Sequence, residues 1–197
     1  RSLFQQNKEM AMAEVQAIKD LDTVKLISYL LEKRCSKQMS HIWNIGLNLA
    51  LRISDLLSVK FTDIQNDRLL IFESKTGKLA EIKLNQKALA FIHEVRITHP
   101  NHVYLFQSYR NQQAKGSPPR PLSRRAVTRA FALVGEELNL KLGTHSMRKT
   151  RGYHLYHKTQ DIARVMKMLR HSSEATTLRY IGITQEEIDK DFEELEL

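Results

Sequence analysis

The sequence predicts a mainly α-helical domain with a small antiparallel β-hairpin. The 197 residues are 42% apolar, which is enough to bury one sizeable core. Apolar residues recur at helical spacing along most of the chain, and this pattern indicates amphipathic helices. The periodicity changes only around residues 68–84, where a single hairpin is expected.

The first predicted helices form the N-terminal part of the core. DTVKLISYLLEKR (22–34) begins with a capping Asp and carries an apolar stripe. Residues 37–51 are apolar nearly all round, so this helix is expected at the centre of the core. Two further helices are predicted in this half, at 54–60 with a Ser cap and at 86–97.

Short extended segments and a loop separate these helices from those of the second half. RLLIFES (68–74) and KLAEIKL (78–84) are predicted strands joined through KTGK, where Gly favours a turn. VYLF (103–106) predicts a short buried strand. RNQQAKGSPPRP (110–121) contains turn-forming residues and almost nothing to bury, so it is predicted to be a loop.

The second half of the chain predicts helices throughout. SRRAVTRAFALVGEEL (123–138) is a Ser-capped helix whose arginines leave the apolar side free for the core. Shorter helices are predicted at 145–157, 159–169 and 173–181. The acidic end, 184–197, predicts a last helix with Ile188, Phe192 and Leu195 at one-turn intervals.

Charge is distributed unevenly along the chain. The net charge is +9, although the last fourteen residues carry −6. Residues 110–170 hold fourteen Lys or Arg against three acids, a net charge of +11. A basic region this concentrated favours a polyanionic partner, either nucleic acid or an acidic membrane surface, with an ordinary solvated surface as the alternative.

The sequence shows no pattern for a disulfide, a membrane span or a metal site. The single Cys, Cys35, excludes an internal disulfide and favours a reducing compartment. No run of eighteen apolar residues and no leader peptide occurs, so no membrane partner and a cytoplasmic location are expected. No acidic cluster at ligand spacing occurs either, so no metal and no other cofactor are expected.

THSMRK (144–149) places a histidine and an arginine one helical turn apart in a basic stretch. Because residues three apart on a helix share a face, His145 and Arg148 can bind one anion together. Alone, such a pair is a weak signal. Its weight comes from further reactive side chains along the chain: Arg52 with Asp55, Lys75 in the hairpin, His171 and Tyr180.

Six of these residues resemble the catalytic positions of the tyrosine recombinases, the phage integrase family. They are, in order, Arg52 in ALRISDLL, Lys75 in SKTGK, His145 and Arg148 in HSMR, His171 in LRHSS and Tyr180 in TTLRY. The hairpin ESKTGK is similar to that of lambda-type integrases. The resemblance implies an integrase-like catalytic domain over 20–183, with 1–19 as a linker remainder or N-terminal extension and 184–197 as an acidic C-terminal helix.

The resemblance implies a site-specific DNA recombinase of integrase or excisionase type. Such an enzyme cuts and rejoins strands without metal, through a 3′-phosphotyrosyl intermediate, and Tyr180 is then the nucleophile. Planar guanidinium groups suit the clamping of non-bridging phosphate oxygens, which is the role implied for Arg52 and Arg148.

The remaining site residues have supporting roles by the same resemblance. His145 is expected as acid and base, and His171 as a further donor to the phosphate. Lys75 is expected to protonate the leaving 5′ oxygen, with Lys78 as a rival for that role. Asp55 is expected to brace Arg52 from behind.

Each assignment has an ordinary structural alternative. Arg52 with Asp55 can be a helix-end ion pair, and Lys75 a solubilising turn residue. His171 can be a buried structural imidazole, and Tyr180 an anchor for the tail. Two other functions also fit the pattern: a type IB topoisomerase, and a DNA-binding regulator that has lost catalytic turnover.

The sequence departs from the family pattern at two positions next to the site. Arg170 stands where Gly is common, and Lys149 where a second His is frequent. The expected partners are double-stranded DNA and further copies of the chain, as a tetramer on paired DNA sites in a nucleoid-associated state, with the tail docked on its own domain or on the next protomer. The expected DNA contacts are Arg124, Arg125, Arg129, Lys149, Arg151 and Arg170.

Overall fold

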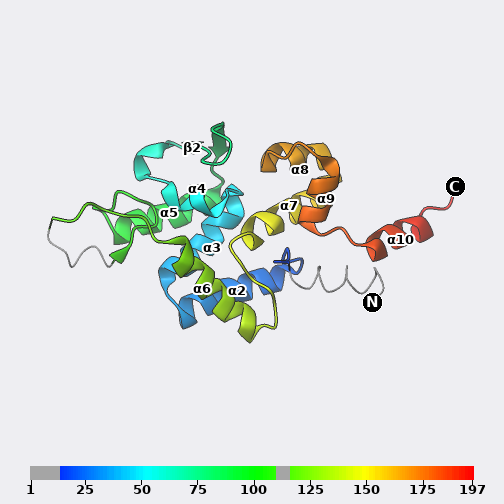
Figure 1. The fold of residues 1–197 in the computed structure, drawn as a ribbon, viewed down its shortest axis with the longest axis horizontal. Coiled ribbons are helices and arrows are strands. Elements are labelled where there is room, and N and C mark those ends of the chain that lie inside the picture. Colours follow the sequence, from blue (N-terminus) through cyan, green and yellow to red (C-terminus); the bar gives the residue numbers. More distant parts are fainter. Residues whose placement is uncertain (1–13, 110–115) are drawn as a thin grey trace.

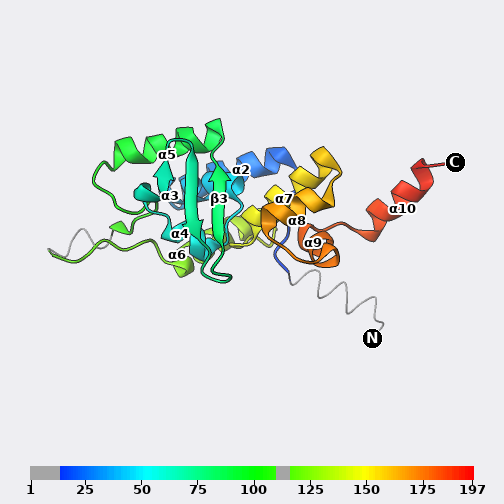
Figure 2. The same ribbon diagram turned by 90° about the horizontal axis from the view of Figure 1, so that it is seen from above.

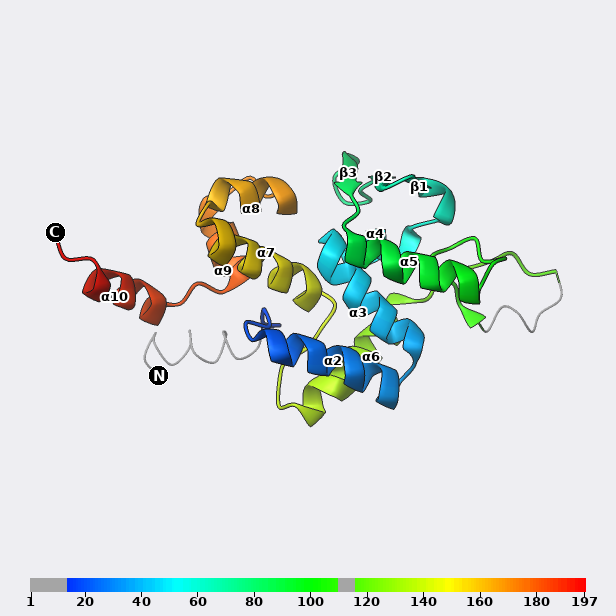
Figure 3. The same cartoon turned by 180° about the vertical axis from the view of Figure 1, so that it is seen from behind.

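A computed structural model describes residues 14–109 and 116–197. This part is mainly helical with one three-stranded antiparallel sheet, which confirms the predicted fold class. What was predicted for 1–13, and for 110–115 of the loop, lies outside the described residues. Figures 1 and 3 show two lobes, one formed by α2 to α6 with the sheet and a smaller one formed by α7 to α9, with α10 beyond them.

The larger lobe is a helical core built around α3. Its helices are α2 (Leu21–Arg34), α3 (Lys37–Leu49), α4 (Ile53–Ser58), α5 (Gln86–Thr98) and α6 (Arg124–Glu137). α3 packs against α2, α5 and α7, which explains why nearly every face of it is apolar. Trp43 is fully buried and meets Phe131 of α6 edge to face, with ring centroids 5.7 Å apart. This confirms the central position predicted for 37–51.

The sheet lies beside α4 and α5 and ends in the turn that faces the smaller lobe (Figures 2 and 3). Its strands are β1 (Ile64–Gln65), β2 (Arg68–Phe72) and β3 (Leu79–Lys83), in that order. β2 and β3 form the predicted hairpin, with Phe72 opposite Leu79. β1, which follows a 3-10 turn at Phe61–Asp63, was not predicted because two residues are too few to show a periodicity.

Three local predictions were wrong. Residues 103–106 are not a strand, because they form only an isolated bridge between Tyr104 and Lys60, although Leu105 and Phe106 are fully buried. The side chain of Asp20, not of Asp22, caps α2. α4 begins one residue before Ser54 and has Arg52 at its N-cap, without a capping side-chain bond.

The smaller lobe has a core of its own. It consists of α7 (Ser146–Thr159), α8 (Ile162–Leu169) and α9 (Glu174–Ile181), which pack together around Val165, Leu169, Ile181 and Ala50. Gly152 lets α7 approach α9 closely, since a Cβ there would lie 2.8 Å from Ile181 Cγ2. Four fully or nearly fully buried residues make this core much smaller than that of the larger lobe.

Residues 14–19 form a strap across α7 to the end of α9. Lys149 Nζ of α7 donates to Val15 O at 2.9 Å, and Ile18 N donates to Thr150 Oγ1 at 2.9 Å. Lys19 Nζ donates to Gly182 O, just after α9, at 2.9 Å. This part of the predicted linker is therefore tied to the smaller lobe.

The acidic tail forms the predicted helix, α10 (Gln185–Glu194). It begins at a capping box of Thr184 and Glu187 and extends away from both lobes (Figure 1). Phe192, on its apolar stripe, is 80% exposed. In the part of the chain that the structure describes, no helix is both long and apolar enough to cross a membrane.

Candidate active site

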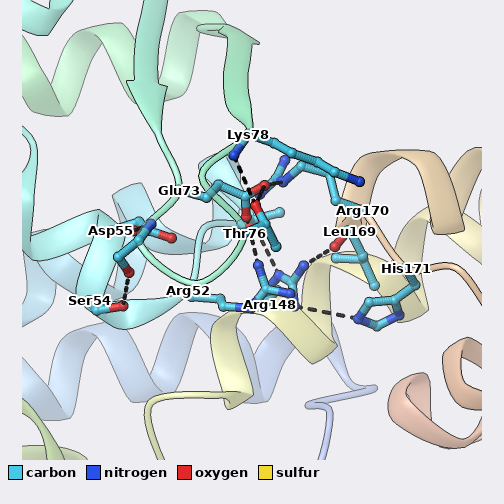
Figure 4. A network of polar contacts seen from close by, with 12 residues as sticks. Arg52, Ser54, Asp55, Glu73, Thr76, Lys78, Arg148, Leu169, Arg170 and His171 are labelled. Carbon is cyan, nitrogen blue, oxygen red and sulfur yellow. Dashed lines mark hydrogen bonds and ion pairs between the residues drawn. The ribbon is translucent and has the colours of Figure 1, made fainter.

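The predicted site residues gather where the β2–β3 turn of the larger lobe faces the smaller lobe, and Figure 4 shows Arg52, Arg148 and His171 there. They come from separate elements: Arg52 from the N-cap of α4, Lys75 from the β2–β3 turn, His145 from the N-cap of α7, Arg148 from the first turn of α7, His171 from the residue pair after α8, and Tyr180 from α9. The positive charges of Arg148, Arg52 and Lys75 all lower the pKa of His171, so these groups share one electrostatic environment.

Arg148 is held rigidly between the two lobes. Its side chain is buried, with Nε donating to Ala50 O at 3.1 Å and Nη2 donating to Leu169 O. Ala50 ends α3 in the left-handed conformation and Leu169 ends α8, so one guanidinium joins both lobes. With two nitrogens anchored, Nη1 is left facing His171, 3.5 Å from its Nε2. A guanidinium fixed in this way suits the binding of an anion in one geometry.

Arg52 is oriented by Glu73, a residue that the sequence did not single out. Arg52 Nη1 donates to Glu73 Oε2 at 2.6 Å, and the Glu73 side chain is fully buried. The bracing role expected of Asp55 is therefore wrong, because Asp55 Oδ1 accepts the backbone N–H of Ser74 at 2.9 Å. Asp55 lies in the first turn of α4, and its carboxylate holds the start of the β2–β3 turn instead of Arg52.

The hydrogen bonds of His171 fix which of its nitrogens carries the proton. Thr177 Oγ1 donates to Ser173 O at 2.9 Å and is then an acceptor for His171 Nδ1, 3.1 Å away. The neutral ring therefore carries its proton on Nδ1 and presents the Nε2 lone pair to Arg148. Burial and then the charges of Arg148, Arg52, Arg170 and Lys75 lower the pKa of His171 to about 4. The ring is neutral near pH 7.

Tyr180 packs against His171 and Arg148, and its hydroxyl oxygen is buried. Its ring meets His171 edge to face, with centroids 4.9 Å apart, and Arg148 Cζ lies 5.6 Å from its centroid. The hydroxyl oxygen is buried without a hydrogen-bond partner in the described part of the chain. Burial raises the pKa of Tyr180 above its usual value. The Arg148 guanidinium, through its charge and its closeness to the hydroxyl, and then the charge of Arg52 lower that pKa by less. The phenol is therefore protonated at neutral pH.

His145 and Lys75 complete the rim of the site. Desolvation of the His145 imidazole, followed by the charges of Arg124 and Lys149, lowers its pKa, although the residue is exposed overall. Lys75 is exposed on the β2–β3 turn, and its charge is one of those that lower the pKa of His171. The charge of Lys78, its rival, is not among those causes.

The residues expected to contact DNA divide into two groups. Arg124, Arg125 and Arg129 are exposed on α6, as a phosphate contact requires. The charged groups of the other three are engaged inside the protein, which does not favour the expectation. Lys149 bonds to Val15, Arg151 Nη1 lies 3.5 Å from Asn48 Oδ1, and Arg170 Nε lies 2.6 Å from Glu73 Oε1.

Two residues of the site were missed by sequence reasoning, Glu73 and Thr177. An acidic residue at the end of a strand ordinarily points to solvent, and nothing local shows that Glu73 is buried. Its place in ESKTGK, two residues from Lys75, was the only available signal. Thr177 could have been found from its spacing, six residues after His171 on the next helix. Among the described residues, no three His, Cys, Asp or Glu side chains group as ligands for a metal.

Comparison with known proteins identifies the family. The model of the phage integrase family matches residues 16–187, which is most of the chain. The chain belongs to the phage integrase family. The probable integrase/recombinase YoeC of Bacillus subtilis is 38% identical to it over 178 residues, which cover 87% of this chain and 92% of that protein. Tyrosine recombinase XerA of Pyrococcus furiosus is 28% identical over 151 residues, 75% of this chain but 51% of that protein.

Solved structures of the same family share the fold. A crystal structure of XerA recombinase superposes with a TM-score of 0.71 at 15% identity, over 92% of this chain and 64% of that one. A lambda integrase dimer bound to a COC′ core site gives 0.66 at 19% identity, over 86% of this chain and 60% of that one. This phage integrase family member thus spans about half the length of the XerA proteins it matches in sequence and under two thirds of these structures.

Proposed function

We propose that this member of the phage integrase family is a site-specific DNA recombinase that cuts and rejoins strands through a 3′-phosphotyrosyl intermediate. One observation carries the proposal: the Tyr180 hydroxyl is buried beside a neutral His171 and the anchored guanidinium of Arg148. The hydroxyl oxygen attacks the scissile phosphorus, the bond from phosphorus to the 5′ oxygen breaks, and that oxygen leaves as a 5′ hydroxyl. Attack by a 5′ hydroxyl on the phosphotyrosine reverses both changes.

The two arginines would stabilise the charge that develops on the phosphate. Arg148 has Nε and Nη2 anchored on backbone carbonyls, and Arg52 has Nη1 fixed on Glu73, so both guanidinium groups are oriented before DNA arrives. Orientation in advance is what makes such donors effective, because no reorganisation is needed during the reaction. Removal of one such donor in other enzymes costs about 10²–10³ in rate.

The acid and base roles fall to the two histidines and a lysine. Both imidazoles have lowered pKa values, so both are neutral and able to accept the proton that Tyr180 must lose. His171 contacts the Tyr180 ring and presents a bare Nε2, and after protonation that nitrogen would donate to the phosphate. For the leaving 5′ oxygen we keep Lys75 as the acid, with Lys78 as its rival, since both are exposed on the β2–β3 turn.

Double-stranded DNA is the proposed partner, and the nucleoid the proposed place of action. The exposed arginines of α6 begin beside His145, since the charge of Arg124 lowers the His145 pKa. Contacts of this kind position the duplex and weaken steeply with added salt. They carry no sequence preference by themselves.

The proposed active form is an assembly of several copies on paired DNA sites, in which the tail of one copy docks on the next. The apolar stripe of α10 is exposed, and a groove of about 900 Å³ lies between the strap and α9, lined partly by Lys19, Lys149 and Arg179. Within the chain, Arg179 pairs with Glu14 and Lys19 lies 3.7 Å from Glu187 of the tail. The acidic tail of a second protomer would take the place of these partners. A lambda integrase of similar fold is described as a dimer bound to a core site, which supports an oligomer here.

Covalent trapping on a nicked suicide substrate tests the proposal. A labelled duplex library, incubated without metal and run on a denaturing gel, should give a protein–DNA adduct with the wild type and none with Tyr180→Phe. Failure of the wild type to form any adduct would favour a DNA-binding regulator instead. Relaxation of supercoiled DNA without partner sites would assign a type IB topoisomerase.

A further inference from the structure

Glu73 is a fully buried carboxylate that lies between two arginines of the site (Figure 4). Oε2 accepts from Arg52 Nη1 at 2.6 Å, and Oε1 lies 2.6 Å from Arg170 Nε as an ion pair whose N–H is not aimed at the oxygen. We propose that Glu73 is a positioning residue for DNA cleavage, which holds Arg52 toward the scissile phosphate and fixes the β2–β3 turn against the residue before His171. This inference rests on the proposed function.

Positive charges outnumber negative charges around Glu73. One carboxylate meets the guanidinium groups of Arg52 and Arg170, and the charges of both also reach the buried Arg148. Arg170 Nη2 is buried without a hydrogen-bond partner in the described part of the chain. A buried cation needs an anion, so a cluster with more arginine than carboxylate is ready for a further anion such as a phosphate.

Glu73 also fixes the segment that carries the proposed acid. Its backbone N–H donates to Lys78 O and its carbonyl accepts from Gly77 N, both at 2.8 Å, which closes the β2–β3 turn around Lys75. Asp55 holds the same turn through the Ser74 N–H. With its side chain clamped by two arginines, Glu73 sets where this turn lies relative to Arg52.

Arg170 connects the same carboxylate to the smaller lobe. It ends α8 in the left-handed conformation, with φ at 56°, and Nη1 donates to Met168 O at 3.1 Å. A glycine adopts this backbone without strain, so an arginine here is retained at a conformational cost. The ion pair to Glu73 joins the β2–β3 turn to His171, the residue after Arg170. Glu73 therefore links Lys75 and Arg52 on one side to His171 on the other.

The test separates DNA binding from cleavage in Glu73→Gln, with Glu81→Gln as the matched control. Glu81 is an exposed hairpin carboxylate that pairs with Arg68 at 3.2 Å, so its substitution removes a charge without touching the site. For Glu73→Gln we expect unchanged or tighter DNA binding, because a negative charge is lost, and single-turnover adduct formation slower by roughly tenfold to a hundredfold. Glu81→Gln should cleave as the wild type does.

Two further variants distinguish positioning from general support of the fold. Arg170→Gly in the Glu73→Gln background removes one uncompensated cation, so it should recover melting temperature but not the cleavage rate, because Arg52 still lacks its carboxylate. Glu73→Asp keeps the charge with a shorter reach, so it should bind DNA normally and cleave at an intermediate rate, even where Glu73→Gln folds poorly. Both outcomes support the proposal.

Other outcomes would overturn it. Wild-type cleavage by Glu73→Gln would do so, and so would a loss confined to DNA affinity and melting temperature with an unchanged rate per bound complex. A double-mutant cycle in melting temperature that shows no coupling between Glu73→Gln and Arg170→Gly would show that the Glu73–Arg170 ion pair contributes nothing to stability, and would contradict the proposed link. Absence of an adduct in the wild type would instead refute the proposed function, while this cycle still reports on the pair.

Discussion

The two lobes of the molecule divide the proposed chemistry between a well-supported and a weakly supported region. The larger lobe presents Arg52 and the hairpin, and its core includes Trp43, Phe131 and many further buried residues. The smaller lobe presents His171 just after α8 and Tyr180 on the short helix α9, around four buried residues. Regions with few buried apolar contacts open at lower free energy than the rest of a domain. Arg52 of the proposed phosphate clamp thus lies on the well-supported side, Arg148 of α7 lies at the junction of the lobes, and the proposed nucleophile lies on the side that opens more easily.

Apolar packing of α3 against α7, with Met147 buried in the core of the larger lobe, joins the two lobes, and a few polar contacts are added at the site. Arg148 binds a carbonyl of each, and Glu73 pairs with Arg170 across the junction. The strap binds α7 and the residue after α9, and its Ile18 is buried in the core of the larger lobe, so the strap contacts both lobes. The charged contacts therefore orient the site residues at a junction that apolar packing also holds.

Arg148→Lys should have the largest effect on the junction. Lysine has one nitrogen, so it cannot bond Ala50 O and Leu169 O and still face His171. We expect adduct formation to fall by about 10²–10³, with faster hydrogen exchange in α8 and α9. Single-turnover cleavage and exchange mass spectrometry measure both. Arg151→Lys is the control, and an equal loss in that variant would contradict the special role of Arg148.

Truncation of one buried residue in each core compares the lobes directly. Phe131→Ala should lower the global free energy of unfolding by about 3–5 kcal/mol, because it empties the larger core. Ile181→Ala should cost about 2–5 kcal/mol, expressed mainly as opening of α8 and α9. Residue-resolved hydrogen exchange measures the difference. Equal loss of protection in α2 and α3 for both variants would show that the lobes unfold as one unit.

Thr177→Val tests the proton position on His171 within the smaller lobe. The variant keeps the shape of the side chain but removes the acceptor for His171 Nδ1–H. The proton of the neutral ring is then no longer held on Nδ1, and Nε2 can carry it instead. We expect slower adduct formation, by roughly tenfold, since such acid–base roles contribute about 10²–10⁴ in full. Thr176→Val, at the exposed neighbouring position, should cleave normally. Imidazole nitrogen shifts in NMR spectra would show the proton still on Nδ1 if the inference is wrong.

The smallest expected effect is a dependence of stability on pH through His171. Its pKa is about 4 in the folded protein and near 6.5 in the unfolded chain, so the unfolded state binds more protons between these values. Stability from this group is present above pH 6.5 and is lost as the pH falls toward 4. The ring is partly exposed, so solvent screening should limit the change to less than about 2 kcal/mol. The difference in free energy of unfolding between wild type and His171→Gln, followed from pH 7 to pH 4.5, should show this slope, and a constant difference would contradict it.

The sequence by itself determined the helices, the hairpin and the order of the reactive residues. Periodicity identified α3 as central and located α5 to α9 within a few residues, because a buried face imposes its own spacing on the chain. It misjudged segments whose structure depends on distant partners. Residues 103–106 look like a strand, but their backbone makes only scattered hydrogen bonds, to residues 59–61 on one side and from Leu122 N to Phe106 O on the other, and no continuous ladder. Helix α2 begins at Leu21, one residue before the predicted start, so the residue whose side chain caps it is Asp20 and not Asp22.

Only the tertiary structure decided which charged side chains form contacts within the protein and which face solvent. Lys149 and Arg151 are as basic in the sequence as Arg124, yet one binds the strap and the other turns toward Asn48. Glu73 and Arg170 become partners because the β2–β3 turn and the end of α8 are brought face to face. A residue pattern reports local periodicity, whereas a buried ion pair depends on the meeting of two distant segments, and that meeting is fixed by how the two cores pack against each other.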